Sequence, residues 1–280
     1  MSAKIIKGEQ IAREMRDNLK KEVASLKEEK NITPGLAVIV VKNPLSRVHV
    51  ARLKERTCRQ LGIKCQMHYL PGTTTVEEVI SLVKKLNFSE EIHGINIHPF
   101  TDPSNQIRIS QVVDYNKDVE GLHFLNMGRF LSEDYEVAPF MAKCIMKMIE
   151  FTGEELKGKK AVIIGRSRLL DIPLSLMLLN KNATVTICHP HTADLSRLTK
   201  DADILVAAAG HPQLVKKDMV KEGAIVIDAG ENRVGTRLIG DVDYVEVEPI
   251  AGWITPVPGG VGPVNIAMLL DNLVKAVKVL

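Results

Sequence analysis

The sequence predicts a two-domain α/β protein in which each domain is built on a parallel sheet. Its 280 residues suffice for about two domains of ordinary size. Short apolar runs rich in β-branched residues alternate with amphipathic segments of helical period, the pattern of parallel strands joined by right-handed helical crossovers. This alternation occurs once in each half, without an internal repeat, so we place the domain boundary between residues 137 and 157.

The first half predicts a three-layer α/β domain that spans residues 1–137 and is completed by a helix at 265–280. Its opening segment is rich in Glu and Lys, with apolar residues at helical spacing, which is typical of an amphipathic helix. The next apolar run, LAVIVV, favours a strand that is buried on both faces. In order, we expect helix 9–30, strand 36–41, helix 46–61, strand 65–70, helix 75–86 and strand 94–99.

The second half predicts a doubly wound parallel sheet over residues 138–264. Its strands are continuous apolar runs, and two of them end in a glycine, Gly210 and Gly230. The expected order is strand 159–167 leading into a turn, helix 173–180, strands 183–189, 202–210 and 223–230, a loop at 254–263, and the closing helix.

Composition excludes several classes of function. Lys and Arg number 37 and Asp and Glu 34, and a net charge of +3 is too small to indicate a nucleic-acid or membrane-surface partner. No apolar run is long enough to span a bilayer, and the first residues turn charged too soon for a secretory signal. Four cysteines without a CxxC pair are typical of reduced thiols, so we expect a cytoplasmic protein. His189 and His191 are two close donors without a third, and we expect no metal site.

The first strand of the second half leads into a turn that suits a dinucleotide. Gly165, Arg166 and Ser167 stand between this strand and a helix, which is how a Rossmann-type domain presents backbone N–H groups and a positive helix end to a pyrophosphate. Many α/β proteins carry a glycine there, but the wider pattern G-x-S-x(5)-P, completed by Pro173, is more particular.

Several motifs in this order carry a resemblance to a known family. They are KDVEG at 117–121, the GRS turn at 165–167, VIDAG at 226–230, GDV at 240–242 and PVPGGVGP at 256–263. The series resembles the bifunctional methylenetetrahydrofolate dehydrogenase/methenyltetrahydrofolate cyclohydrolase family over essentially the whole chain. The resemblance implies a catalytic domain, a Rossmann domain, a site for folate and nicotinamide nucleotide, and a homodimer, with the last helix packed on the first domain.

The resemblance also implies a set of catalytic residues. Lys54 matches the lysine that such enzymes place beside the reactive carbon, and burial lowers a lysine's pKa enough for it to act near neutral pH. The family's tyrosine four residues earlier is Val50 here, and a one-residue bulge would bring His49 into its place. His98 stands where the family has glutamine, and Glu120 where it has an aspartate that holds the pterin. We expect Lys54, His98 and His49 to be catalytic, and Val50 and Glu120 to contact substrate.

The proline- and glycine-rich loop is a second candidate for substrate contact. Pro258, Gly259, Gly260 and Pro263 combine rigid and permissive backbone, which favours a stiff loop that approaches a ligand closely. The glycines have a plain structural interpretation as well, because they also suit a turning loop.

The nucleotide side departs from the family at two positions. The family's turn has a second glycine where this chain has Asp171, and a serine where it has Pro190. Two unit charges ~4 Å apart at an effective dielectric of ~20 interact by about 4 kcal/mol, roughly a thousandfold in affinity. Asp171 also suits a helix N-cap before Pro173, where it fills the anion site itself. Arg166 can bind a 2′-phosphate, and Gly210, which ends a neighbouring strand, is a further candidate for cofactor contact. Because of Asp171 and Pro190 we nevertheless expect NAD(P) binding to be weak or absent.

Three functional hypotheses remain open at this stage. The first is the family activity, oxidation of 5,10-methylenetetrahydrofolate with NADP followed by cyclohydrolase action, with the dehydrogenase half in doubt. The second is transfer of the methylene carbon to another nucleophile without NAD(P), a Mannich-type reaction, with Lys54, His98 or His49 as base. The third is a non-catalytic paralogue that only binds folate.

Overall fold

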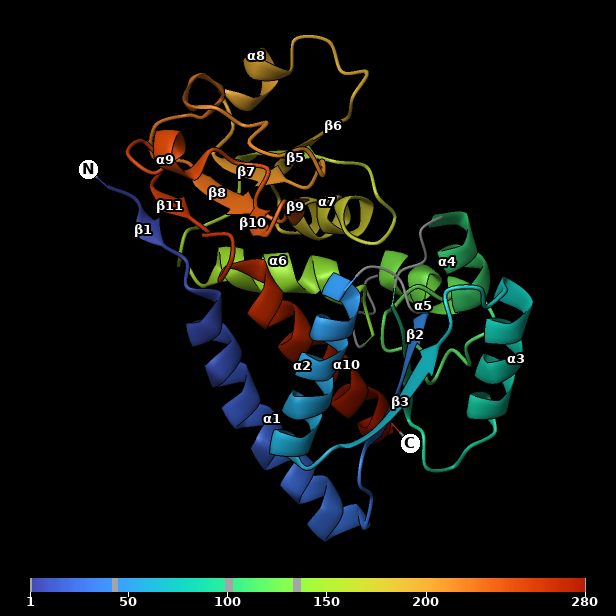
Figure 1. Ribbon diagram of the computed structural model, residues 1–280. Coiled ribbons are helices and arrows are strands. Elements are labelled where there is room, and N and C mark those ends of the chain that lie inside the picture. Colours follow the sequence, from blue (N-terminus) through green and yellow to red (C-terminus); the bar gives the residue numbers. More distant parts are fainter. Residues whose placement is uncertain (1, 42–44, 99–102, 133–136, 280) are drawn as a thin grey trace. The chain divides into compact units, whose positions relative to one another are not determined.

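The computed structural model describes residues 2–41, 45–98, 103–132 and 137–279 (Figure 1). The chain forms two compact units. The N-terminal unit comprises Glu14–Phe140 and Ile266–Leu280, and the C-terminal unit comprises the residues up to Arg13 together with Met141–Asn265. The first 13 residues, which sequence analysis assigns to the N-terminal domain, belong to the C-terminal unit because strand β1 (Lys4–Ile5) pairs with β11 (Trp253–Ile254).

The N-terminal unit is built on a three-stranded parallel sheet in the order β3-β2-β4. The central strand β2 (Gly35–Val41) is buried along almost its whole length, as the apolar run predicts. It is flanked by β3 (Lys64–Leu70) and β4 (Gly94–Ile97), so the expected parallel βαβαβ arrangement is confirmed.

Helices cover both faces of this sheet, which makes the expected three layers. On one face Ala37 and Ile39 pack against Val79 and Val83 of α3 (Val76–Asn87). On the other face the closing helix α10 (Val261–Val279) comes so close that a Cβ added to Gly94 would meet Leu273 at 2.7 Å. The other helices that contribute to this unit are α1 (Gly8–Lys30), α2 (Leu45–Leu61), α4 (Pro103–Ser110) and α5 (Phe124–Leu131).

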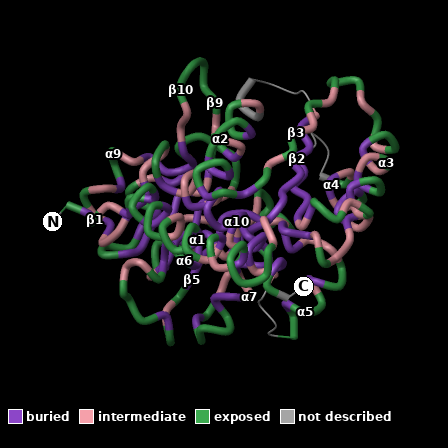
Figure 2. Tube along the Cα trace, turned by 90° about the horizontal axis from the view of Figure 1, so that it is seen from below, coloured by how far each residue is buried: buried purple, intermediate pink, exposed green. Residues whose placement is uncertain are grey.

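The closing helix α10 (Val261–Val279) is longer than predicted and belongs mostly to the N-terminal unit. It begins inside the expected loop 254–263, because β11 takes the first residue of that stretch and the helix its last three. Most of its residues are buried (Figure 2). Asn272 donates to the carbonyls of Val119 and Ala138 at 3.0 and 2.9 Å, so the helix packs on the N-terminal unit as the resemblance implies.

The C-terminal unit holds a six-stranded parallel sheet in the order β1-β11-β8-β7-β5-β6. The chain passes from β5 outward to β6 and then returns to β7 on the opposite side of β5. This reversal creates a topological switch point at the carboxyl ends of β5 and β7, the place where open α/β sheets bind ligands. The principal strands are β5 (Lys160–Ile164), β6 (Thr184–Cys188), β7 (Ile204–Ala207) and β8 (Ile225–Asp228).

Helices and a hairpin complete the C-terminal unit. The helices are α6 (Phe140–Glu150), α7 (Asp171–Asn180), α8 (Leu195–Thr199), α9 (Tyr244–Val247) and the 3-10 helix η1 (Lys217–Met219), and the hairpin is formed by β9 (Asn232–Val234) and β10 (Arg237–Ile239). No helix in the described ranges is both long and apolar enough to cross a membrane. All four cysteines are free.

Candidate active site

Lys54 is the centre of a buried polar cluster in the N-terminal unit. It lies on α2, is 6% exposed, and reaches the carboxyl end of β4. Its Nζ donates to Asn96 Oδ1 at 2.6 Å and lies 3.4 Å from His98 Nε2. An amine in this position is sequestered from bulk water but has polar partners, which is the environment of a functional lysine rather than a surface one.

Glu120 closes the same cluster from the opposite side. Its Oε1 accepts the backbone N–H of Ile97 at 2.8 Å and a short hydrogen bond from Asn96 Nδ2, and its Oε2 accepts from Gln106 Nε2 at 3.3 Å. The carboxylate is 6% exposed. Asn96 therefore joins the two ionisable groups, accepting from the lysine with one end of its amide and donating to the glutamate with the other.

Burial moves the pKa values of both ionisable groups toward neutrality. Desolvation lowers the pKa of Lys54 to about 8, against the opposing attraction of the Glu120 carboxylate. Desolvation raises the pKa of Glu120 to about 7, although the Ile97 N–H and Lys54 favour its charged form. Two groups that both titrate near pH 7 are suited to proton transfer, since each populates its acid and base forms.

His98 and His49 differ sharply in position. His98 is buried, and its backbone N–H is bonded to Ile39 O at 2.9 Å, so the end of β4 holds its ring beside Lys54. His49 is exposed, and Val50 is 36% exposed. Helix α2 runs unbroken through both, so the bulge expected to bring His49 into the tyrosine's place is absent, and that expectation is wrong.

Two members of this cluster, Asn96 and Gln106, are not among the residues predicted from the sequence. Asn96 had a signal, because it is the polar residue in the otherwise apolar strand segment GINI and is only 2% exposed. Buried polar side chains need partners, and a partner in turn indicates a network. Gln106 had no such signal, since nothing in the sequence separates it from other polar residues on α4.

The proline- and glycine-rich loop packs within the C-terminal unit. Gly260 is buried, and a Cβ added to Gly8, at the start of α1, would lie 1.7 Å from its carbonyl oxygen. Gly8 N–H donates to Gly259 O at 3.0 Å, while Pro258 follows a cis peptide bond and is exposed. Pro263 lies in the first turn of α10 and not in the loop. The structural interpretation of Gly260 is thus supported by a direct backbone contact.

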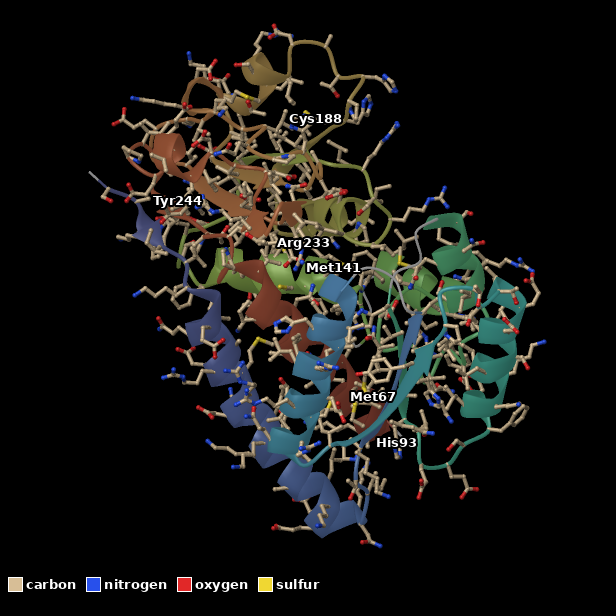
Figure 3. The ribbon with its side chains drawn as sticks, viewed as in Figure 1. Met67, His93, Met141, Cys188, Arg233 and Tyr244 are labelled. Atoms are coloured by element: carbon tan, nitrogen blue, oxygen red, sulfur yellow. The ribbon has the colours of Figure 1, made fainter. Side chains whose placement is uncertain are left out.

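The turn after β5 lies at the switch point of the C-terminal sheet. Gly165 N–H donates to the carbonyl of Cys188, which is labelled in Figure 3, at 2.9 Å. Arg166 and Ser167 are exposed, yet Ser167 N–H donates to Asp171 Oδ2 at 2.6 Å. Asp171 is the first residue of α7 and not its N-cap, which is Leu170, so the predicted capping role is wrong.

The loop after β7 forms the other side of this switch point. Gly210 is exposed, and its N–H donates to Asp241 Oδ2 at 2.8 Å, as does that of Ala209 at 2.6 Å. Asp241, a motif residue without an expected role, therefore holds this loop. Pro190 is exposed after β6, in a stretch where His189 and His191 approach with ring centroids 6.0 Å apart. In the described ranges no three His, Cys, Asp or Glu side chains form a metal-binding group.

The sheet topology of the C-terminal unit and the backbone at its switch point suit the binding of a dinucleotide. Its switch point is flanked by Gly165 and Gly210, and the absence of side chains at both allows close approach of a phosphate or ribose. One feature departs from this fit. A Cβ placed on Gly165 would meet the Asp171 carboxyl group at 2.6–2.8 Å, so that carboxyl lies against the turn itself.

Comparison with known proteins defines the class to which this fold and site belong. Residues 6–120 match the catalytic domain of tetrahydrofolate dehydrogenase/cyclohydrolase, and residues 139–280 match its NAD(P)-binding domain. The chain belongs to the tetrahydrofolate dehydrogenase/cyclohydrolase family.

Relatives match the chain from end to end. It is 45% identical to the bifunctional protein FolD of Moorella thermoacetica, covering 99% of this chain and 100% of the relative, and 46% identical to that of Halothermothrix orenii, covering 98% of each. Among solved structures, the Trypanosoma brucei methylenetetrahydrofolate dehydrogenase-cyclohydrolase complexed with NADP and inhibitor has a TM-score of 0.95 at 32% identity, over 99% of this chain and 98% of that one.

These comparisons do not bear out the doubt about the dehydrogenase half. The NAD(P)-binding domain of the family is matched by residues 139–280, and the relatives are named as bifunctional proteins. The family uses tetrahydrofolate derivatives and NADP.

Proposed function

We propose that this chain oxidises 5,10-methylenetetrahydrofolate with NADP and hydrolyses the 5,10-methenyltetrahydrofolate that results. Both domains of the bifunctional family are matched along the chain, which supports the two activities together. The observation that carries the proposal is the Lys54 amine, buried within hydrogen-bond distance of Asn96 and beside His98 and Glu120.

Lys54 is the group to which we assign proton transfer. With a pKa of about 8, roughly a tenth of the lysine is unprotonated at about pH 7, some 300-fold more than for an ordinary lysine. The neutral amine accepts a proton from the attacking water, and the ammonium form returns it to the folate nitrogen that leaves. Asn96 and His98 fix the direction of the amine.

Glu120 is the group to which we assign the pterin. Its carboxylate is already held by the Ile97 N–H, Asn96 and Gln106, so its position is set before substrate arrives. A preorganised acceptor costs little to order on binding. Bound NADP supplies the hydride acceptor, and we assign its contacts to Gly165, Arg166, Ser167 and Gly210.

The test is turnover by the purified protein. Methylenetetrahydrofolate with NADP or NAD is followed by the absorbance of the reduced nucleotide, and hydrolysis of methenyltetrahydrofolate by loss of its own absorbance. Lys54→Met abolishes hydrolysis above the enzyme-free rate, whereas Lys64→Met, which changes a lysine with a 62% exposed side chain, does not. Unchanged hydrolysis in a folded Lys54→Met protein refutes the assignment.

The same assays separate the other two hypotheses. Consumption of methylenetetrahydrofolate without nucleotide reduction, but dependent on an added nucleophile, favours methylene transfer. Binding of a stable folate analogue without any turnover favours a non-catalytic paralogue. Neither outcome is compatible with the proposed activity.

We further propose that the chain acts as a homodimer in the cytoplasm. The resemblance implies the dimer, and four free cysteines are typical of a reducing compartment. Light scattering on a size-exclusion column tests the dimer, and a monomer at micromolar concentration contradicts it.

A further inference from the structure

Asp171 occupies an unusual position for a carboxylate. It is 1% exposed, and its carboxyl group rests against Gly165, where an added Cβ would meet Oδ2 at 2.6 Å and Oδ1 at 2.8 Å. Its Oδ2 accepts the Ser167 N–H at 2.6 Å. An acidic group thus takes up both the space beside the glycine and a backbone donor of the turn that faces the switch point.

The other carboxylate oxygen has no partner. Among the described residues, Asp171 Oδ1 is buried without a hydrogen bond. A buried charged oxygen without a donor carries most of its desolvation cost, so the ionised group is poorly satisfied where it lies. A carboxylate whose only role was to stabilise the turn would have hydrogen-bond donors for both of its oxygens. The turn is already stabilised by Ser167 Oγ, which accepts the Leu170 N–H at 3.2 Å.

We propose that Asp171 is an internal competitor of the nucleotide's phosphate at this turn, and that it sets the affinity of the C-terminal unit for phosphorylated ligands. The proposal rests on nucleotide binding by the proposed function. A phosphate that reaches the Ser167 N–H meets a carboxylate on the same donor, and it binds only after the carboxyl group is neutralised or rotated away.

The competition has a defined pH dependence. Burial raises the pKa of Asp171, and the Asp241 carboxylate, from the segment after β10, raises it further. The fraction of Asp171 in the ionised, competing form therefore increases as the pH rises, and the affinity for the nucleotide falls. Arg166 and Arg168 stand on the turn itself, and His189 follows Cys188, whose carbonyl accepts the Gly165 N–H.

The experiment measures NADPH binding by fluorescence titration of the full-length protein between about pH 6 and about pH 8.5. Asp171→Asn keeps an acceptor for the Ser167 N–H but removes the charge, and Asp171→Gly removes the group. Asp203→Asn is the matched control, because Asp203 directly precedes β7 at the amino end of the same sheet and accepts the Lys160 N–H. The ratio of the wild-type affinity to that of Asp171→Asn at each pH cancels the titration of NADPH and of every group that the two proteins share.

We expect Asp171→Asn and Asp171→Gly to bind NADPH at least about tenfold more tightly than wild type at about pH 8, and the difference shrinks as the pH falls and the Asp171 carboxyl group takes up its proton. Asp203→Asn binds as wild type does. Equal or weaker binding by both Asp171 variants overturns the proposal, as does absence of NADPH binding in every form. Hydrolysis of methenyltetrahydrofolate needs no nucleotide, so its presence or absence reports separately on the proposed function.

Discussion

We predict that Asn96 influences the pH at which Lys54 becomes a base. Its amide oxygen accepts from the lysine Nζ at 2.6 Å and thereby stabilises the ammonium form. A hydrogen bond from a charged donor contributes about 1.5–3 kcal/mol, and one pKa unit corresponds to about 1.4 kcal/mol. We therefore expect loss of the acceptor in Asn96→Leu to lower the lysine's pKa by about 1–2 units further.

The assay is the pH profile of kcat for hydrolysis of methenyltetrahydrofolate, with the enzyme-free rate subtracted at each pH. The rising limb moves to lower pH by about 1–2 units in Asn96→Leu. Thr57→Val is the control on the same helix. The Thr57 hydroxyl donates within its own helix, to Leu53 O, so we expect the profile to stay in place. A folded, active Asn96→Leu protein with an unshifted limb refutes the coupling of the amide to the lysine.

Three further changes test the site and its support. In Glu120→Gln the attraction that favours the ammonium form of Lys54 is lost, so the rising limb again moves to lower pH, and calorimetry shows weaker binding of a folate analogue. Gly8→Ala forces a Cβ against a backbone oxygen at 1.7 Å and lowers the free energy of unfolding, measured in denaturant melts, by more than about 3 kcal/mol. Gly128 lies in a helix with open space around it, so Gly128→Ala raises the free energy of unfolding by about 0.5–1 kcal/mol. Asn272→Leu leaves two buried carbonyls of the N-terminal unit without their donor and costs about 2–4 kcal/mol.

Each of the three has an outcome that contradicts its reasoning. An unshifted profile in Glu120→Gln means that the carboxylate does not act on the lysine. A Gly8→Ala protein as stable as wild type means that the start of α1 yields freely. An Asn272→Leu protein with unchanged stability means that other donors replace the amide.

The elements of the fold follow from local pattern to a large extent. Strand β2 is a continuous apolar run. The start of helix α3 is marked in the sequence by Thr75 and Glu78, which form a capping box. Strand β1 could not be predicted, because two residues hold an extended conformation only through their pairing with β11, 248 residues away or more along the chain.

The site divides in the same way between local and distant causes. Residue type and motif were enough to predict Lys54, His98 and Glu120 as candidates. The exposure of His49 could not be predicted in this way, because it depends on α2 continuing without a bulge. That Asn96 lies between the lysine and the glutamate depends on three segments meeting at the end of β4.

The sequence alone determined the class of fold, the order of most strands and helices, and the family to which the chain belongs, because these depend on periodicity and on short motifs. Only the tertiary structure decided which side chains share a buried space and hence which titrate near neutral pH. Burial and hydrogen bonding are properties of packing between distant segments, and the carboxyl of Asp171 turns back onto Gly165 for the same reason.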